Sequence, residues 1–208
     1  GRGRGRNPGV STLGPVIGSW VERLGGRNFW VGPEAFFQVH TAAAENLLME
    51  VRDNVPSGLG LILDAHAGVG TFALSLADRA KRVIAFEMDR ASVDSARWTA
   101  RAGSIANVDF RVGKAEMLIG RMAEGESPDL VLLDPPRSGC HHTLLRRIEE
   151  MKVPRVVYVS CDPSTLARDI KMLSGSYKLT SARMIDMFPQ TYHLETVAVL
   201  DLVADLQS

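Results

Sequence analysis

The sequence predicts an α/β fold with a mostly parallel sheet, covered by helices on both faces, and an antiparallel edge. From Leu61 onward, short apolar runs rich in β-branched residues alternate with stretches of helical periodicity. A glycine-rich turn, Gly68-Val69-Gly70, follows the first of these runs. The last two strand patterns, at 178–186 and 196–202, have no helical pattern between them, which favours an antiparallel hairpin at one edge of the sheet.

Composition narrows the class of protein. The 208 residues suit one domain with a full core, or one domain with an appendage. Lys plus Arg equals Asp plus Glu at 24 each, so the net charge gives no general attraction to nucleic acid or membrane. The two cysteines, Cys140 and Cys161, are too few for a disulfide framework or a metal cluster. Because the chain has no membrane-length apolar run and no signal-peptide pattern, we expect a soluble, intracellular protein, most simply a cytoplasmic one. We also expect a monomer without a metal.

Two segments precede the alternating pattern. Residues 1–14 begin with Gly/Arg repeats and lack apolar periodicity, so we expect a flexible N-terminal stump. In residues 15–56, two apolar runs flank Gly25-Gly26 and predict a β-hairpin, and the spacing over 34–55 predicts a helix. An isolated hairpin is marginal in water, so it should pack on the main domain or on something upstream. Residues 57–208 should form that main domain.

The main domain should alternate strands and helices. We expect strands at 61–63, 83–86, 108–112, 130–133, 156–159, 178–186 and 196–202. We expect helices at 71–80, 91–102, 114–123, 142–151 and 163–173.

The glycine turn has the features of a nucleotide site. Gly68 and Gly70 allow a tight turn after a strand, and Glu87 ends the next strand about 20 residues on, where an acid can bind ribose hydroxyls. The turn lacks the third glycine of the pyrophosphate-binding version and has no Walker lysine. A cofactor without a pyrophosphate fits better, and S-adenosylmethionine is the obvious one. The alternative is that these glycines only shape the turn.

Cys161 is a candidate nucleophile. It follows the strand at 156–159 and precedes a helix start with Asp162 as N-cap and Pro163 at the first helical position. Ligands bind at the carboxyl ends of strands in open α/β sheets, and a helix N-terminus favours the thiolate. The alternative is a small buried hydrophobic residue.

Five short stretches in order resemble one family, the S-adenosylmethionine-dependent RNA uracil-5-methyltransferases, which make 5-methyluridine in tRNA or rRNA. They are AFFQVH at 35–40, LDAHAGVGTF at 63–72, LLDPPRSG at 132–139 with SCDPSTLARD at 160–169, and DMFPQTYHLETV at 186–197. The resemblance covers about residues 15–202 and implies a Rossmann-like methyltransferase fold. The upstream RNA-binding domain of such enzymes has no counterpart here, so we expect a catalytic domain.

The resemblance also implies roles for individual residues. Those implied to bind the cofactor are Gln38, His66, Thr71, Glu87 at the ribose, and Asp134, with Gly68 and Gly70 in the turn. Cys161 matches the nucleophile and Glu195 the base. The chain departs from the family at His40, at His66-Ala67 and at Asp162, where members commonly have Asn, Tyr-Cys and Asn. A carboxylate at Asp162 should oppose ionisation of the neighbouring thiol.

The chemistry explains these residue types. Uracil C5 is a weak nucleophile until a thiolate adds at C6, and a base must later remove the C5 proton. An Asp-Pro-Pro turn also serves exocyclic amines without any thiol, so an N-methyltransferase remains an alternative, as does a non-catalytic RNA-binding module. Arg137 and Arg168 could hold RNA phosphates, or pair with Asp169 and Glu149 as surface charges.

Overall fold

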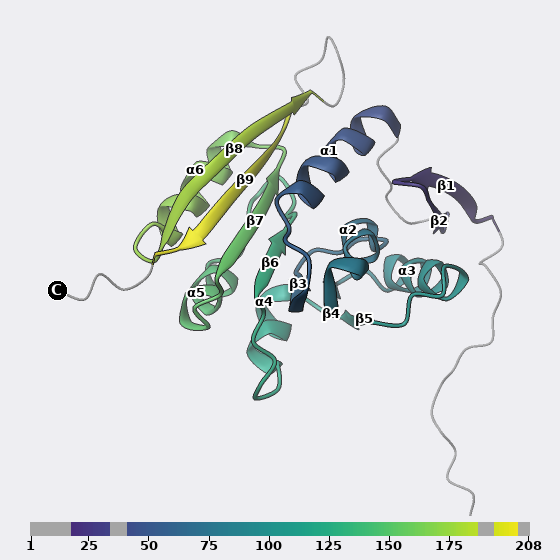
Figure 1. Cartoon of the computed structure of the whole chain (residues 1–208), viewed down its shortest axis with the longest axis horizontal. Coiled ribbons are helices and arrows are strands. Elements are labelled where there is room, and N and C mark those ends of the chain that lie inside the picture. Colours follow the sequence, from purple (N-terminus) through teal and green to yellow (C-terminus); the bar gives the residue numbers. More distant parts are fainter. Residues whose placement is uncertain (1–17, 34–40, 187–193, 204–208) are drawn as a thin grey trace, which may run out of the picture.

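The computed structural model describes residues 18–33, 41–186 and 194–203, and it confirms the predicted α/β fold (Figure 1). Its central sheet has seven strands in the order β5-β4-β3-β6-β7-β9-β8. The strands are β3 (Leu59–Asp64), β4 (Ala80–Glu87), β5 (Val108–Val112), β6 (Leu130–Leu133), β7 (Arg155–Ser160), β8 (Tyr177–Asp186) and β9 (Leu194–Leu202). Strands β3 to β7 pair in parallel, whereas β9 runs antiparallel between β7 and β8.

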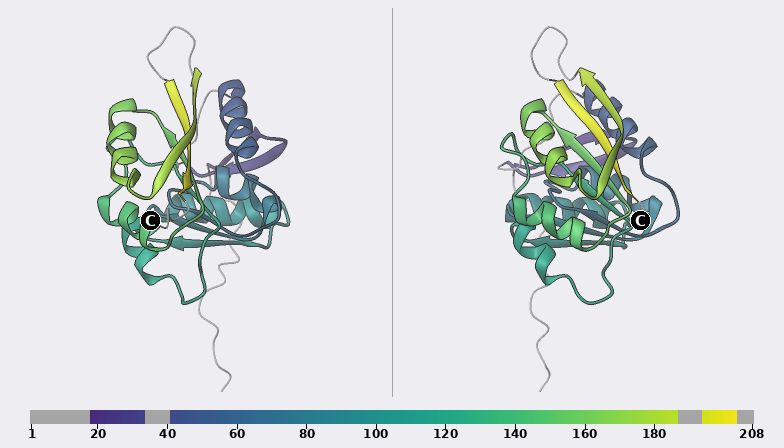
Figure 2. Two further views of the ribbon diagram at one scale, coloured as in Figure 1. Left: turned by 60° about the vertical axis from the view of Figure 1, so that its left-hand side comes forward. Right: turned by 90° about the vertical axis from the view of Figure 1, so that its left-hand side faces the viewer.

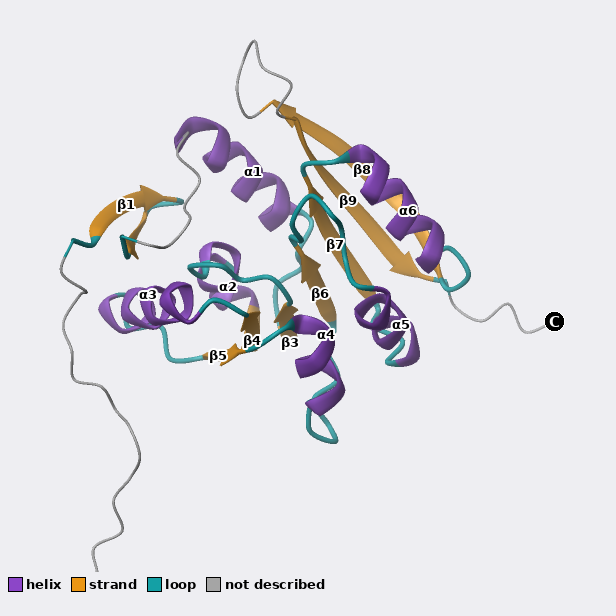
Figure 3. Ribbon diagram, turned by 180° about the vertical axis from the view of Figure 1, so that it is seen from behind, coloured by secondary structure: helices purple, strands orange, loops and turns teal. Residues whose placement is uncertain are grey.

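Helices cover both faces of the sheet (Figure 3). They are α1 (Thr41–Asp53), α2 (Thr71–Ser75), α3 (Arg90–Ala102), α4 (Ala115–Leu118), α5 (His142–Glu150) and α6 (Pro163–Leu173). The first three pack in one hydrophobic core and the last three in another. Side chains alternate along the strands between the two cores, so Ile62 faces the first while Leu61 and Leu63 face the second.

Two predicted helices are shorter than expected. The pattern at 71–80 forms α2 and then a 3-10 turn at Ala77–Arg79, after which β4 starts at Ala80. The pattern at 114–123 forms α4 and a 3-10 turn at Ile119–Arg121. In both cases the last turn of the helix tightens before the chain leaves it, as helix ends often do. Strand β9 is longer than predicted, because it begins at Leu194 and so includes Glu195.

The predicted hairpin forms from β1 (Trp20–Leu24) and β2 (Arg27–Val31), with positive φ angles of 57° at Gly25 and 74° at Gly26. It packs on the main domain, as its small size requires. The backbone N–H of Trp30 donates to Oγ1 of Thr99 on α3 at 2.8 Å, and Leu24 and Phe29 are buried. The hairpin therefore belongs to the same core as α1, α2 and α3.

The antiparallel edge stands between helices from the two layers. Figure 2 shows α6 on one side of the β8–β9 pair and α1 on the other. In the part of the chain that the structure describes, no helix has the length and apolar character needed to cross a membrane.

Candidate active site

The candidate residues gather at the carboxyl edge of the parallel strands. Asp64 ends β3, Glu87 ends β4, and Asp134 and Cys161 directly follow β6 and β7. Strand β9 runs the other way, so its start, with Glu195, reaches the same edge. Four parallel strands and the antiparallel β9 thus bring together residues from five separate segments.

The turn after β3 requires its glycines. Gly68 and Gly70 have φ angles of 54° and 83°, a region that residues with side chains rarely adopt. At Gly70 a Cβ would also lie 3.1 Å from Ala96, Leu74 and Phe110 atoms. The turn therefore packs close to α3 and leads directly into α2, which begins at Thr71.

Glu87 fixes the turn from the neighbouring strand. Its Oε2 accepts a hydrogen bond from the backbone N–H of Gly68 at 2.9 Å, and its Oε1 accepts one from Asp89 at 2.7 Å. A carboxylate has about four acceptor positions, so two hydrogen bonds leave room for hydroxyl donors. The acid predicted to bind ribose thus also holds the glycine turn in place.

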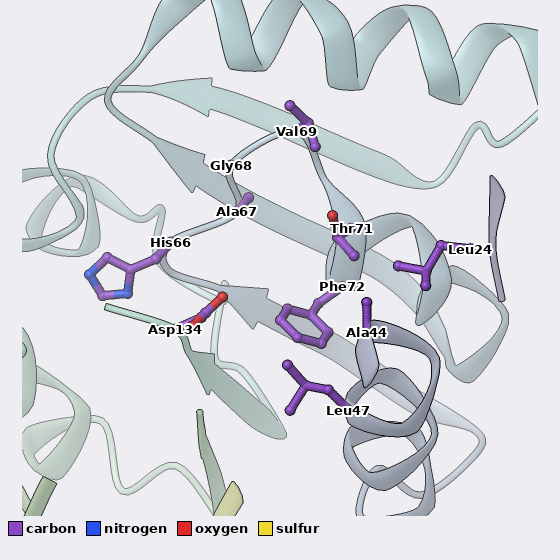
Figure 4. A pocket seen from close by; sticks show the side chains of 10 residues that line it. All are labelled: Leu24, Ala44, Leu47, His66, Ala67, Gly68, Val69, Thr71, Phe72 and Asp134. Carbon is purple, nitrogen blue, oxygen red and sulfur yellow. The ribbon is translucent and has the colours of Figure 1, made fainter. Parts of the chain in front are cut away.

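A pocket lies beside the turn (Figure 4). Its lining residues are Leu24, Ala44, Leu47, His66, Ala67, Gly68, Val69, Thr71, Phe72 and Asp134. Four predicted cofactor residues, His66, Gly68, Thr71 and Asp134, are among them, while Glu87 contacts the pocket through Gly68. Sequence reasoning missed the apolar wall from β1, α1 and α2, because its residues show only the spacing of an ordinary core.

Two buried polar atoms beside the turn have no hydrogen-bond partner among the described residues, namely Oδ2 of Asp64 and Nδ1 of His66. Burial raises the pKa of Asp64 to about 7, and Glu87 adds to the effect. Burial lowers the pKa of His66 to about 4, against the opposing charge of Glu116. Unpartnered buried groups cost free energy, so this site suits a polar ligand that supplies partners. Asp64 was not a predicted site residue, although an acid at the end of a strand is a usable signal.

Cys161 occupies the predicted position, and the helix start is confirmed. Asp162 caps α6, with Oδ1 accepting from the N–H groups of Ser164 and Thr165 at 2.9 Å each, and Pro163 opens the helix. Cys161 is partly exposed. The expected depression of its pKa is wrong, since burial, Glu195 and Asp134 raise the thiol pKa while Arg137 opposes them.

The expectation for Asp162 also needs correction. The carboxylates that act most on the Cys161 thiol are Glu195 and Asp134. Asp162 is turned toward the backbone N–H groups of α6, which lower its own pKa. The Asp162 carboxylate therefore interacts with the start of the helix, whereas the sequence had predicted that it would act mainly on the thiol.

Glu195 is next to Cys161 across the sheet. Ser160 pairs with Thr196 in the antiparallel register of β7 and β9, so the residues that flank this pair are Cys161 and Glu195. Burial raises the pKa of Glu195, and Arg137 opposes the rise. Burial, Glu195 and Asp64 together raise the pKa of Asp134 well above its usual range. The predicted thiol and base are thus in electrostatic contact with each other and with Asp134.

Not every candidate can be placed. Gln38 and His40 lie outside the described residues. Arg168 forms an ion pair with Asp169 at 2.7 Å, which was one of its two predicted roles. Asp169 is fully buried, however, so this is not the expected surface pair.

Comparisons with known proteins identify the family of the chain. The family model described as tRNA (Uracil-5-)-methyltransferase matches residues 24–203. An uncharacterized RNA methyltransferase of Synechocystis, sll1967, is 41% identical over 185 residues, which are 88% of this chain and 40% of that protein. An uncharacterized RNA methyltransferase of Listeria monocytogenes, lmo1703, is 39% identical over 183 residues, which are 87% of this chain and 40% of that protein. The chain thus spans about 40% of the length of the curated relatives it matches.

Two solved structures are similar to this chain, one in sequence and fold and the other in fold alone. The Pyrococcus abyssi tRNA (uracil-54, C5)-methyltransferase, crystallised with S-adenosyl-L-homocysteine, superposes with a TM-score of 0.76 at 34% identity. The match covers 88% of this chain and 44% of that one. Trm5b from the same organism, at 16% identity and a TM-score of 0.69, shares the fold. The chain, with its glycine turn, its Asp-Pro-Pro-Arg loop and its cysteine after β7, belongs to the tRNA (uracil-5-)-methyltransferase family.

Proposed function

We propose that this chain is the catalytic domain of an S-adenosylmethionine-dependent enzyme that methylates C5 of a uracil in tRNA or rRNA, with Cys161 as nucleophile and Glu195 as base. The observation that carries the proposal is the pairing of a partly exposed thiol with a carboxylate of raised pKa across the β7–β9 register. An enzyme that methylates an amine directly has no use for that pair.

S-adenosylmethionine would lie along the pocket beside the glycine turn, with Gln38 as a further contact. Its ribose hydroxyls would face Glu87, its other polar groups would face Asp134 and His66, and its apolar parts would face Phe72 and Leu47. These residues fit a cofactor that is part polar and part apolar and carries no phosphate. Once bound, it supplies an electrophilic methyl group on a sulfonium.

Cys161 begins the reaction. Its thiolate adds to C6 of the uracil, a C6–S bond forms, and the electron pair of the C5–C6 double bond moves into the ring to give an enolate. C5 of that enolate then takes the methyl group, while the bond from methyl to sulfonium breaks and its electron pair stays on the departing sulfur. Because the pKa of the resting thiol is raised, the thiolate is a minor species at neutral pH and the attack accelerates as pH rises.

Glu195 completes the reaction. After transfer, C5 carries a methyl group and a proton, and Glu195 accepts that proton. The electron pair left at C5 re-forms the double bond, the C6–S bond breaks, and the thiolate leaves with its pair. A raised pKa makes the carboxylate a stronger base for this step.

The reaction class can be tested by identifying the methylated nucleoside. Unmodified tRNA and rRNA transcripts would be incubated with the chain and a methyl-labelled cofactor, digested and analysed by mass spectrometry. We expect 5-methyluridine from the native chain and none from Cys161→Ala. An N-methylated base that persists in Cys161→Ala would replace the proposal with an amine methyltransferase, and no methylation of any transcript would favour a non-catalytic RNA-binding module.

Cofactor binding can be tested separately by calorimetry. Glu87→Ala should weaken binding of S-adenosylhomocysteine by about 1 to 3 kcal/mol, because the ribose hydroxyls lose their acceptor and the turn loses a hydrogen bond. Glu126→Ala is the matched control, because that acid pairs with Arg111 and Arg82 away from the pocket. Equal affinity of Glu87→Ala and the native chain would contradict the cofactor assignment.

A further inference from the structure

Asp169 on α6 holds three segments together. Its side chain is fully buried, and Oδ2 accepts hydrogen bonds from the hydroxyl of Tyr158 at 2.7 Å and from the backbone N–H of Cys140 at 2.8 Å. Its Oδ1 accepts from Nε and Nη2 of Arg168 at 2.9 and 2.7 Å. This one carboxylate therefore connects α6, β7 and the loop that follows β6.

Arg168 adds a second connection to the same loop. Its Nη2 also donates to the backbone oxygen of Ser138 at 2.9 Å, although about half of its side chain is exposed. Gly139 has a φ of 77°, and a Cβ there would collide with the Arg168 guanidinium and lie 2.7 Å from Oδ2 of Asp169. The loop thus packs directly against the Arg168–Asp169 pair, at a place where only glycine fits.

The loop held in this way, residues 134–140, carries two charges that act on Cys161. Arg137 lowers the pKa of the Cys161 thiol and of Glu195, whereas Asp134 raises the thiol pKa. Cys161 precedes α6 by two residues, so the thiol and the pair that holds the loop belong to one strand–helix unit. Charge interactions weaken with distance, so the position of the loop sets their strength.

We propose that Arg168 and Asp169 are positioning residues, which hold loop 134–140, and through it Arg137, against the Cys161 thiol. The inference rests on the proposed function, since it concerns the nucleophile of that reaction. It gives a reason for a buried acid and a half-exposed arginine that do not themselves contact the pocket.

Arg168→Ala tests the proposal without RNA or turnover. The variant removes the hydrogen bond to the backbone oxygen of Ser138 and loosens the loop. The Arg137 charge should then lower the pKa of the Cys161 thiol by a smaller amount. Alkylation of Cys161 by neutral iodoacetamide would be followed by mass spectrometry from pH 7 to 10 in the 208-residue chain. Below the midpoint we expect alkylation about two- to fivefold slower than in the native chain, with the midpoint at higher pH.

Two further variants separate positioning from general charge and from stability. Lys171→Ala removes a positive charge from the exposed face of the same helix and should leave the rate unchanged. In an Arg137→Gln background, Arg168→Ala should have no additional effect, because the charge that it positions is absent. Partial unfolding would change the alkylation rate in the opposite direction. It would expose both cysteines, so Cys161 would be alkylated faster and Cys140 would also be labelled.

The proposal is overturned if Arg168→Ala alkylates at the native rate, if it slows alkylation equally with and without Arg137, or if it accelerates labelling of both cysteines. Failure of the chain to produce 5-methyluridine would count against the proposed function and leave these thiol measurements unchanged.

Discussion

Cys140 and Cys161 lie in the loops that follow two neighbouring parallel strands, yet their surroundings differ completely. Cys140 is buried, its backbone N–H donates to Asp169, and burial raises its thiol pKa to about 12. Cys161 is partly exposed, and its thiol pKa is raised by burial and by Glu195 and lowered by Arg137. Cys161 directly follows β7, whereas Cys140 lies near the end of the loop between β6 and α5. Access and charged neighbours therefore distinguish the candidate nucleophile from the structural thiol.

Alanine at each cysteine gives the largest contrast. Cys161→Ala should reduce methyl transfer by a factor of about 10³ or more, because uracil C5 is not activated without addition at C6. Cys140→Ala should retain activity and lose about 1 kcal/mol of stability, as a small buried side chain is removed. Methyl transfer to tRNA or rRNA and urea unfolding of both variants would measure the two effects. Loss of activity in Cys140→Ala with unchanged stability would contradict the structural role of Cys140.

The buried acids Asp169 and Asp64 differ in another way, in how many hydrogen bonds their carboxylates accept. Asp169 accepts four hydrogen bonds. Asp169→Ala should lower the free energy of unfolding by about 3 to 5 kcal/mol, because the Tyr158 hydroxyl and the Cys140 N–H lose a buried acceptor. Urea unfolding would measure this, with Glu150→Ala, an exposed acid of α5, as the control. Equal stability of the two variants would mean that the network is weak.

Asp64 is the opposite case, because its Oδ2 has no partner among the described residues. Its folded-state pKa of about 7 exceeds the ordinary value of 3.8, so its contribution to stability is full below about pH 4 and is lost as pH rises to 7. Asp64→Asn removes this dependence. As the pH rises from 5 to 8, the free energy of unfolding of the variant should increase by about 3 kcal/mol relative to that of the native chain. Parallel stability curves over that range would show that Asp64 ionises at its usual pH.

The charges around Cys161 should give smaller effects of opposite sign. Glu195 raises the thiol pKa and Arg137 lowers it. At pH 8, Glu195→Gln should therefore increase the alkylation rate of Cys161 about two- to fivefold, and Arg137→Gln should decrease it by a similar factor. Asp162→Asn should change it least, because the Asp162 carboxylate bonds to the N–H groups of α6. A larger effect from Asp162→Asn than from Glu195→Gln would reverse this order.

Much of the fold and several site positions could be predicted because local sequence signals determine them. The alternation of apolar runs gave the strands, and the Asp-Pro pair at 162–163 gave the start of α6. The thiol pKa could not be predicted, since it depends on Glu195 and Arg137, which are far from Cys161 in the chain. The buried Asp169 network was likewise hidden, because its donors come from three segments. The domain boundaries at residues 14 and 56 stay predictions.

The most direct test of the central claim is to stop the reaction after methyl transfer. Glu195→Gln should still allow Cys161 to attack and the methyl group to move, but the C5 proton would remain and the thioether to RNA would persist. Denaturing electrophoresis with a methyl-labelled cofactor and a uridine-bearing stem-loop should show a labelled protein–RNA band for Glu195→Gln, and none for Cys161→Ala or the double variant. A labelled band in the double variant would contradict Cys161 as the nucleophile, and normal turnover by Glu195→Gln without a band would contradict Glu195 as the base.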